Sequence, residues 1–112
     1  MPDMKMGPKT AQLITILDEI KSLLDADGER NWARFIASSK SKLLNLDYTG
    51  IEYLLSGYGG MGSFNDLVIG QDTIGGEFRW KEGSVEANDR LNKLRSEAYF
   101  LADFIKHNSE IQ

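Results

Sequence analysis

The chain has 112 residues, no cysteine and a formal net charge of −4. This length predicts one domain over residues 1–112, with residues 1–9 disordered, and the lack of cysteine excludes disulfides and thiolate chemistry. The acidic balance argues against nucleic acid as a partner, because phosphate binding needs a concentrated basic surface. It favours a basic partner only if the acidic residues cluster. Neither a signal peptide nor an apolar run of about 20 residues is present, so we expect no membrane association and a cytoplasmic protein.

The first half of the chain predicts three helices. Apolar residues recur with helical spacing over residues 10–26, and Gly28 provides a stop. A second helix is predicted from about Asn31, a good N-cap, to residue 46. A third, short helix is predicted from the capping box that Thr49 and Glu52 form, and it runs into a glycine-rich loop.

The second half predicts a hairpin and one long helix. Residues 67–69 and 77–80 favour β-strands, and the glycine-containing segment 70–76 separates them. The last helix is predicted from about Ser84 to His107, and Phe100 and Phe104 indicate burial on more than one side near its end. The fold class is therefore mostly α: an antiparallel helical bundle of about four helices with a small β-hairpin inserted before the last helix. The alternative, an α+β domain with a larger sheet, has too few strand-like runs.

Catalytic and metal-binding patterns are sparse. His107 is the only histidine, and Asp103 precedes it by four residues on the side of the helix opposite the apolar seam. We interpret these two as a solvated pair at a helix end. The sequence therefore predicts no catalytic residues, no metal site and no cofactor. Acid–base chemistry by carboxylates alone is the alternative that the sequence leaves open.

The glycine-rich loop around residues 57–66 is the main candidate for function. Its spacing matches neither a Walker motif nor, after a helix, a dinucleotide-binding turn. It could turn a structural corner with Met61 and Phe64 as core plugs, present a partner surface, or expose N–H groups as an anion-binding nest. The candidate binding residues are Gly60, Met61, Gly62, Ser63, Phe64, Asn65, Asp66 and, from the hairpin, Trp80.

A family resemblance rests on three stretches of the chain. They are the tryptophan helix at residues 31–33, the segment GGMGSFNDL at residues 59–67, and Asn88 followed by the pattern of residues 91–99. Together they resemble a family of small, uncharacterised bacterial proteins, a domain of unknown function, over about residues 13–105. The resemblance implies a bacterial source and brings no catalytic residues.

Three hypotheses about function follow. The first is a non-enzymatic protein-binding module, of which an immunity-type protein is one example, with aromatic anchors at Phe64, Phe78 and Trp80. The second is a small-ligand or phosphate binder, or an enzyme, in which Asp66 acts as acid or base and Asn65 orients the ligand. The third is a structural subunit that forms a homodimer through leftover apolar helix surface.

Overall fold

The computed structural model describes residues 6–59 and 61–108. Its elements in chain order are α1 (Pro8–Asp27), α2 (Arg30–Leu44), α3 (Thr49–Ser56), the 3₁₀ turn η1 (Phe64–Asp66), β1 (Gln71–Ile74), β2 (Glu77–Trp80) and α4 (Ser84–Asn108). The predicted fold class, a mostly helical chain with a two-stranded hairpin before the last helix, is confirmed. Within the described residues, no helix is both long and apolar enough to cross a bilayer.

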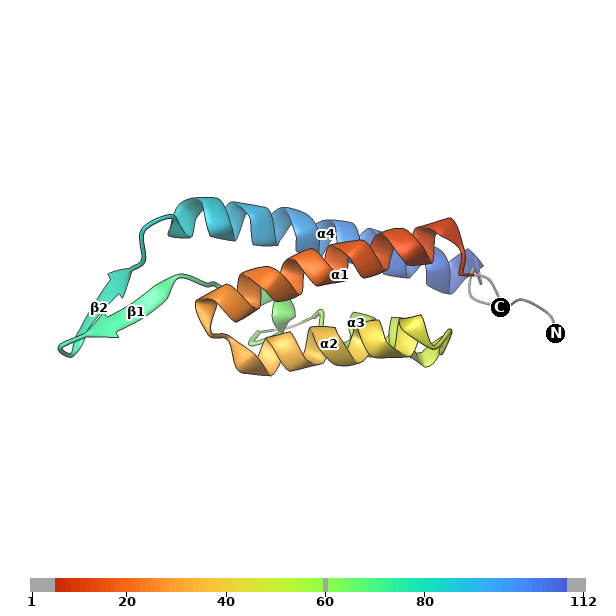
Figure 1. Ribbon diagram of the computed structural model, residues 1–112, viewed down its shortest axis with the longest axis horizontal. Coiled ribbons are helices and arrows are strands. Elements are labelled where there is room, and N and C mark those ends of the chain that lie inside the picture. Colours follow the sequence, from red (N-terminus) through yellow and green to blue (C-terminus); the bar gives the residue numbers. More distant parts are fainter. Residues whose placement is uncertain (1–5, 60, 109–112) are drawn as a thin grey trace.

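The four helices pack in a ring. α1 lies against α2 and α4, and α3 closes the ring by contacting α2 and α4. The hairpin extends beyond one end of this bundle, and the start of α1 and the end of α4 lie at the other end (Figure 1). The core consists of one apolar cluster drawn from all four helices, to which the loop after α3 adds Phe64 and Ile69.

The helix ends differ from the predictions in their caps. Gly28 closes α1 with φ of 79°, as expected. The N-cap of α2 is Glu29 and not Asn31, because the Glu29 carboxylate accepts the N–H of Trp32. At α3 the predicted capping box is also wrong. The Asp47 carboxylate accepts from both the N–H and the hydroxyl of Thr49, and these bonds lower the pKa of Asp47.

The first strand of the hairpin lies later than predicted. Residues 67–69 are extended but unpaired with a strand, and β1 occupies Gln71–Ile74, within the expected turn. Gly70 separates the two segments with φ of +85°, and a Cβ there would lie 2.5 Å from Cβ of Ser84, so only glycine fits. Gly75 and Gly76, with φ of 60° and 85°, form the two-residue turn of the hairpin.

The end of α4 is less buried than predicted. Phe100 is 70% exposed and Phe104 is 46% exposed, so the last turns are not covered on several sides. The buried positions in this part of α4 are Ala98, Ala102 and Ile105, which share the single face toward α1 and α3. The side chains of Phe100 and Phe104 therefore remain outside the core.

Candidate functional site

The glycine-rich loop folds back on itself. The N–H of Phe64 donates to the carbonyl of Gly57 at 2.8 Å, and the N–H of Gly62 donates to the Asp66 carboxylate at 2.8 Å. The Ser63 hydroxyl accepts from the N–H of Asn65, and the Asp66 N–H bonds to the Ser63 carbonyl. These four N–H groups are engaged by protein acceptors, and one acceptor carries a negative charge. This arrangement does not favour an anion-binding nest.

Phe64 is the plug that seals the loop to the bundle. Its side chain is fully buried, with ring centroids 5.3 Å from Trp32, 5.6 Å from Tyr58 and 6.0 Å from Phe35. Its burial corrects the hypothesis that Phe64 anchors a partner at the surface, and confirms its alternative role as a core plug. Met61 is the opposite case, because its side chain is completely exposed. Gly60, another candidate residue, lies outside the described residues.

A buried arginine fastens this loop to α4. Nη1 of Arg95 donates to the carbonyl oxygens of Phe64 at 2.7 Å and Leu67 at 2.8 Å, and Nη2 donates to the side chain of Asn92. Arg95 is only 7% exposed, and desolvation lowers the pKa of its guanidinium, which nevertheless stays charged. Sequence reasoning missed this residue. The sequence pattern that could have identified Arg95 is its position four residues after Leu91, on the buried face of the helix.

Asn88 and Asp27 hold the following segment in place. The Asn88 side chain accepts from the N–H of Ile69 at 2.9 Å and donates to the Ile69 carbonyl at 2.8 Å, as a neighbouring strand would. The Asp27 carboxylate accepts from the N–H of Gly70 at 2.8 Å and pairs with Lys81 at 3.2 Å. Both ends of the hairpin are therefore fixed to the bundle.

Tyr58 gives a titration that can be tested. Its hydroxyl donates to the carbonyl of Arg95 at 2.8 Å, and burial raises its pKa. In the unfolded chain Tyr58 ionises near pH 10, while the folded chain keeps the proton, so folding stability falls as pH rises above about 10. We expect Tyr58→Phe to cost about 1 kcal/mol at pH 7, from the lost hydrogen bond, and this deficit to shrink above pH 10.

The measurement is urea unfolding of both proteins from pH 7 to 11, with a tyrosinate absorbance titration of each folded protein. The two folded proteins should give the same tyrosinate titration over this pH range, because folded Tyr58 keeps its proton. An ionisation near pH 10 that disappears in Tyr58→Phe would contradict the assignment.

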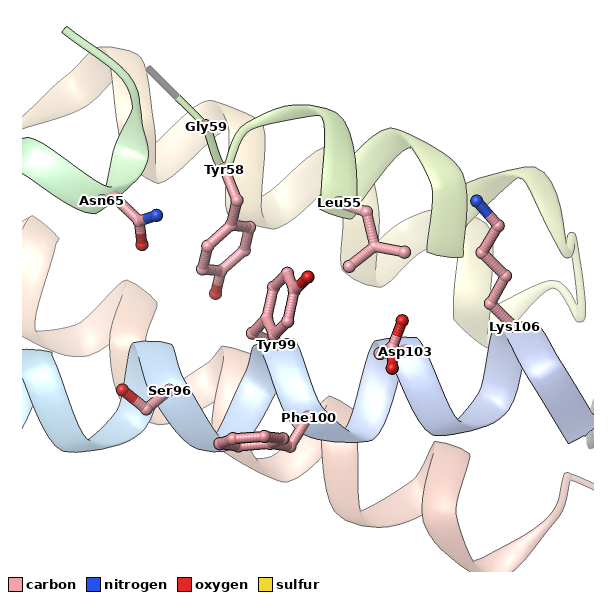
Figure 2. Close-up of a pocket in the computed structure, with 9 residues that line it drawn as sticks. All are labelled: Leu55, Tyr58, Gly59, Asn65, Ser96, Tyr99, Phe100, Asp103 and Lys106. Atoms are coloured by element: carbon pink, nitrogen blue, oxygen red, sulfur yellow. The ribbon is translucent and has the colours of Figure 1, made fainter. Parts of the chain in front are cut away.

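An aromatic cleft lies between α3, the glycine-rich loop and α4. Its volume is about 550 Å³, and its lining residues are Leu55, Tyr58, Gly59, Asn65, Ser96, Tyr99, Phe100, Asp103 and Lys106. Figure 2 shows Tyr58 and Tyr99 reaching toward one another from the two sides, with ring centroids 5.2 Å apart. At one end of the cleft, Lys106 pairs with Glu52 at 3.7 Å, and Nδ1 of His107 lies 3.4 Å from the Asp103 carboxylate and 2.8 Å from the Asp103 carbonyl oxygen. The predicted solvated pair of Asp103 and His107 is thus confirmed.

The hairpin exposes large apolar side chains on both of its strands. All eight strand residues are exposed, and Phe78 and Trp80 stay 56% and 53% exposed with their rings 5.2 Å apart. Val68 and Val85 are also exposed, at 46% and 69%, and both line a groove of about 430 Å³ with Trp80. We call Val68, Phe78, Trp80 and Val85 the hairpin patch.

The candidate loop residues divide between two sides of the molecule. Gly62, Ser63 and Asp66 line a shallow hollow of about 310 Å³ that shares Leu67 and Val68 with the groove beside Trp80. Asn65 instead lines the aromatic cleft. The ligand-binding hypothesis required Asn65 and Asp66 to lie in one site, and the structure does not bring them together. Asp66 and Trp80 instead flank one continuous surface.

Acidic residues cluster at the same end of the molecule. Residues 66–89 contain six acidic and two basic residues, so this segment carries the charge of −4 that the whole chain has. The six acidic side chains are all exposed: Asp66, Asp72, Glu77, Glu82, Glu86 and Asp89. Of the two basic residues, Arg79 lies near Glu77 at 3.5 Å and Lys81 is engaged by Asp27. The segment around the hairpin therefore carries an excess of acidic side chains.

Comparison with known proteins gives one match, over residues 25–77. This segment matches a domain of unknown function, DUF6966. It runs from the end of α1 to the first residue of β2 and includes the glycine-rich loop. The match supports an uncharacterised domain family. No curated protein and no solved structure is significantly similar to the chain.

Proposed function

We propose that this chain is a cytoplasmic, non-enzymatic protein-binding module of bacterial origin that binds its partner through the hairpin patch. The observation that carries the proposal is the exposure of Phe78 and Trp80 on a two-stranded ribbon, where the bundle leaves both strands uncovered. Both side chains are about half exposed, so each offers apolar ring surface that a partner can bury, and aromatic side chains dominate the energetics of many interfaces. Exposed aromatic side chains with a polar surround are typical binding anchors.

The charge around the hairpin patch indicates the chemistry of the partner. The segment 66–89, with a net charge of −4, attracts a basic surface and speeds its association, while it repels another acidic surface. A second copy of this chain would place two such segments against each other, so a homodimer through the hairpin is disfavoured. The proposed partner is a protein with lysine or arginine residues around an apolar recess. An immunity-type role is one specific form of this proposal.

The other candidate surfaces support binding less well. In the aromatic cleft, both charged groups already have partners and the Tyr58 hydroxyl is bonded to the backbone. In the glycine-rich loop, the N–H groups of Gly62 and Phe64 are engaged within the loop. The hairpin patch is different, because the exposed apolar surface of its side chains is not covered by the helices.

The proposal predicts loss of a partner when the anchors are removed. We expect Phe78→Ser with Trp80→Ser to weaken the complex about 100-fold or more, since each binding hot spot contributes about 2 kcal/mol or more. A matched control is Phe100→Ser with Phe104→Ser, which removes two equally exposed aromatic side chains from α4. Affinity purification with each protein, from a lysate of the source organism, identifies the partner, and calorimetry then measures its affinity.

Thermal unfolding of both double variants provides the control for folding. The proposal is contradicted if the partner binds the hairpin variant as tightly as the wild type, or if only the α4 variant loses it. A tenfold increase in salt concentration, from about 50 to about 500 mM, should weaken the wild-type complex, because salt screens the attraction between surface charges.

A further inference from the structure

The backbone of the hairpin has a defined inner and outer edge. Gln71 pairs with Trp80, Thr73 with Phe78, and the N–H of Lys81 donates to the carbonyl of Gly70 at 2.7 Å. In an antiparallel ladder, hydrogen-bonded and non-bonded pairs alternate. Because the pair Gly70–Lys81 is bonded, the pairs that contain Phe78 and Trp80 are non-bonded. The N–H and carbonyl groups of Phe78 and Trp80 therefore point outward from β2.

The two outer edges of the hairpin are not equivalent. On β1, the N–H of Thr73 is engaged by the Asp72 carboxylate at 2.9 Å, so this edge lacks one of its donors. On β2, no bond from within the described residues reaches the outward groups of Phe78 or Trp80. The hairpin stands clear of the helices along its length (Figure 1). An open strand edge of this kind is a template for another strand.

The side chains of β2 present different chemistry on its two faces. Successive side chains alternate across a strand, so Phe78 and Trp80 lie on one face while Glu77 and Arg79 lie on the other. Asp72 pairs with Arg79 across the ladder and adds a second acidic side chain to that other face. A strand beside β2 would therefore meet an aromatic face and a second face on which Glu77 and Arg79 are the nearest side chains.

We propose that the partner docks as an extended segment paired with the outer edge of β2, and that this segment alternates apolar and basic side chains. The inference rests on the proposed function and specifies its mode. Apolar side chains of the segment cover Phe78 and Trp80, and basic ones lie beside Glu77 on the other face. The four outward backbone groups of Phe78 and Trp80 supply the hydrogen bonds, as in other cases of strand addition.

The test uses capped nine-residue peptides of alternating valine and lysine as probes for the wild-type protein. In one form the backbone amide nitrogen of every valine is methylated. In another form the backbone amide nitrogen of every lysine is methylated, so the side chains are the same in all three peptides. Only one set of nitrogens faces β2 in a paired strand: the valine set if the peptide runs antiparallel, the lysine set if it runs parallel. We expect the unmodified peptide and one methylated form to bind, and the other form to bind at least 10-fold more weakly.

Amide chemical shifts locate the contact, and the largest changes are expected at residues 77–81 of the protein. Equal binding of the two methylated forms would overturn strand addition, because contact through side chains alone is indifferent to backbone methylation. Failure of the unmodified peptide to bind would also overturn it. In either case the proposed function stands if the double variant of Phe78 and Trp80 still loses its protein partner, and falls if that variant keeps it.

Discussion

Replacement of Phe64 by alanine is expected to destabilise the fold by about 3–5 kcal/mol, the usual cost of removing a fully buried ring. The ring lies at the centre of an aromatic cluster with Trp32, Phe35 and Tyr58, and none of its surface is exposed. The substitution leaves a cavity between the glycine-rich loop and α2. Urea unfolding followed by tryptophan fluorescence measures the loss, since Trp32 lies beside the cavity.

Met61→Ala is the matched control for this substitution. It removes a large apolar side chain from the same loop, but Met61 is fully exposed, so we expect a change within about 0.5 kcal/mol. Equal effects of the two substitutions would contradict the assignment of Phe64 as the plug and of Met61 as a surface residue. A small effect of Phe64→Ala alone would show that the loop does not depend on its plug.

Replacement of Arg95 by methionine is expected to cost about 3 kcal/mol or more. Methionine retains the apolar stem but removes the charged donor from the carbonyl groups of Phe64 and Leu67, and leaves Phe64 only the N–H of Leu67 at 3.3 Å. Each hydrogen bond to a charged group contributes about 1.5–3 kcal/mol. The same change should loosen the loop locally. We therefore expect faster hydrogen exchange at the amides of residues 64–67, in addition to a lower denaturation midpoint.

Lys93→Met is the control on the same helix, because Lys93 is exposed and two residues from Arg95. It should leave both the midpoint and the exchange rates nearly unchanged. If Arg95→Met lowered stability without any change in exchange at residues 64–67, the guanidinium would be a packing group and not the fastener of the loop.

The elements with strong periodicity could be predicted from the sequence. α4 was predicted as Ser84 to His107 and ends one residue later, because a long run of apolar residues with steps of three and four leaves little choice. The hairpin was predicted in the right place between helices, and β2 at the right residues, because a strand-like run follows the glycine pair. Its first strand was misplaced, since Leu67–Ile69 is as apolar as a strand but bonds to the Asn88 side chain.

The candidate site could be predicted only in part, because tertiary packing decides which of its side chains are buried. Met61 and Phe64 are both large apolar residues in one loop, and only the folded chain shows that one plugs the core while the other faces solvent. Arg95 was missed because a charged residue is normally assigned to the surface, and its partners are carbonyl groups that have no signature in the sequence. Trp80 was identified correctly as exposed, although its groove depends on Val68 and Val85.

The contacts of Asn88 and Arg95 also decide how large the autonomous folding unit must be. The matched family segment ends at residue 77, yet side chains of α4 donate hydrogen bonds to the carbonyl groups of Phe64, Leu67 and Ile69. A fragment cut at residue 77 would contain the residues of α2 and α3 but would lose these hydrogen bonds. The stretch that is recognisable by sequence is therefore smaller than the stretch that folds cooperatively, and a truncated protein for structural work should extend through the end of α4.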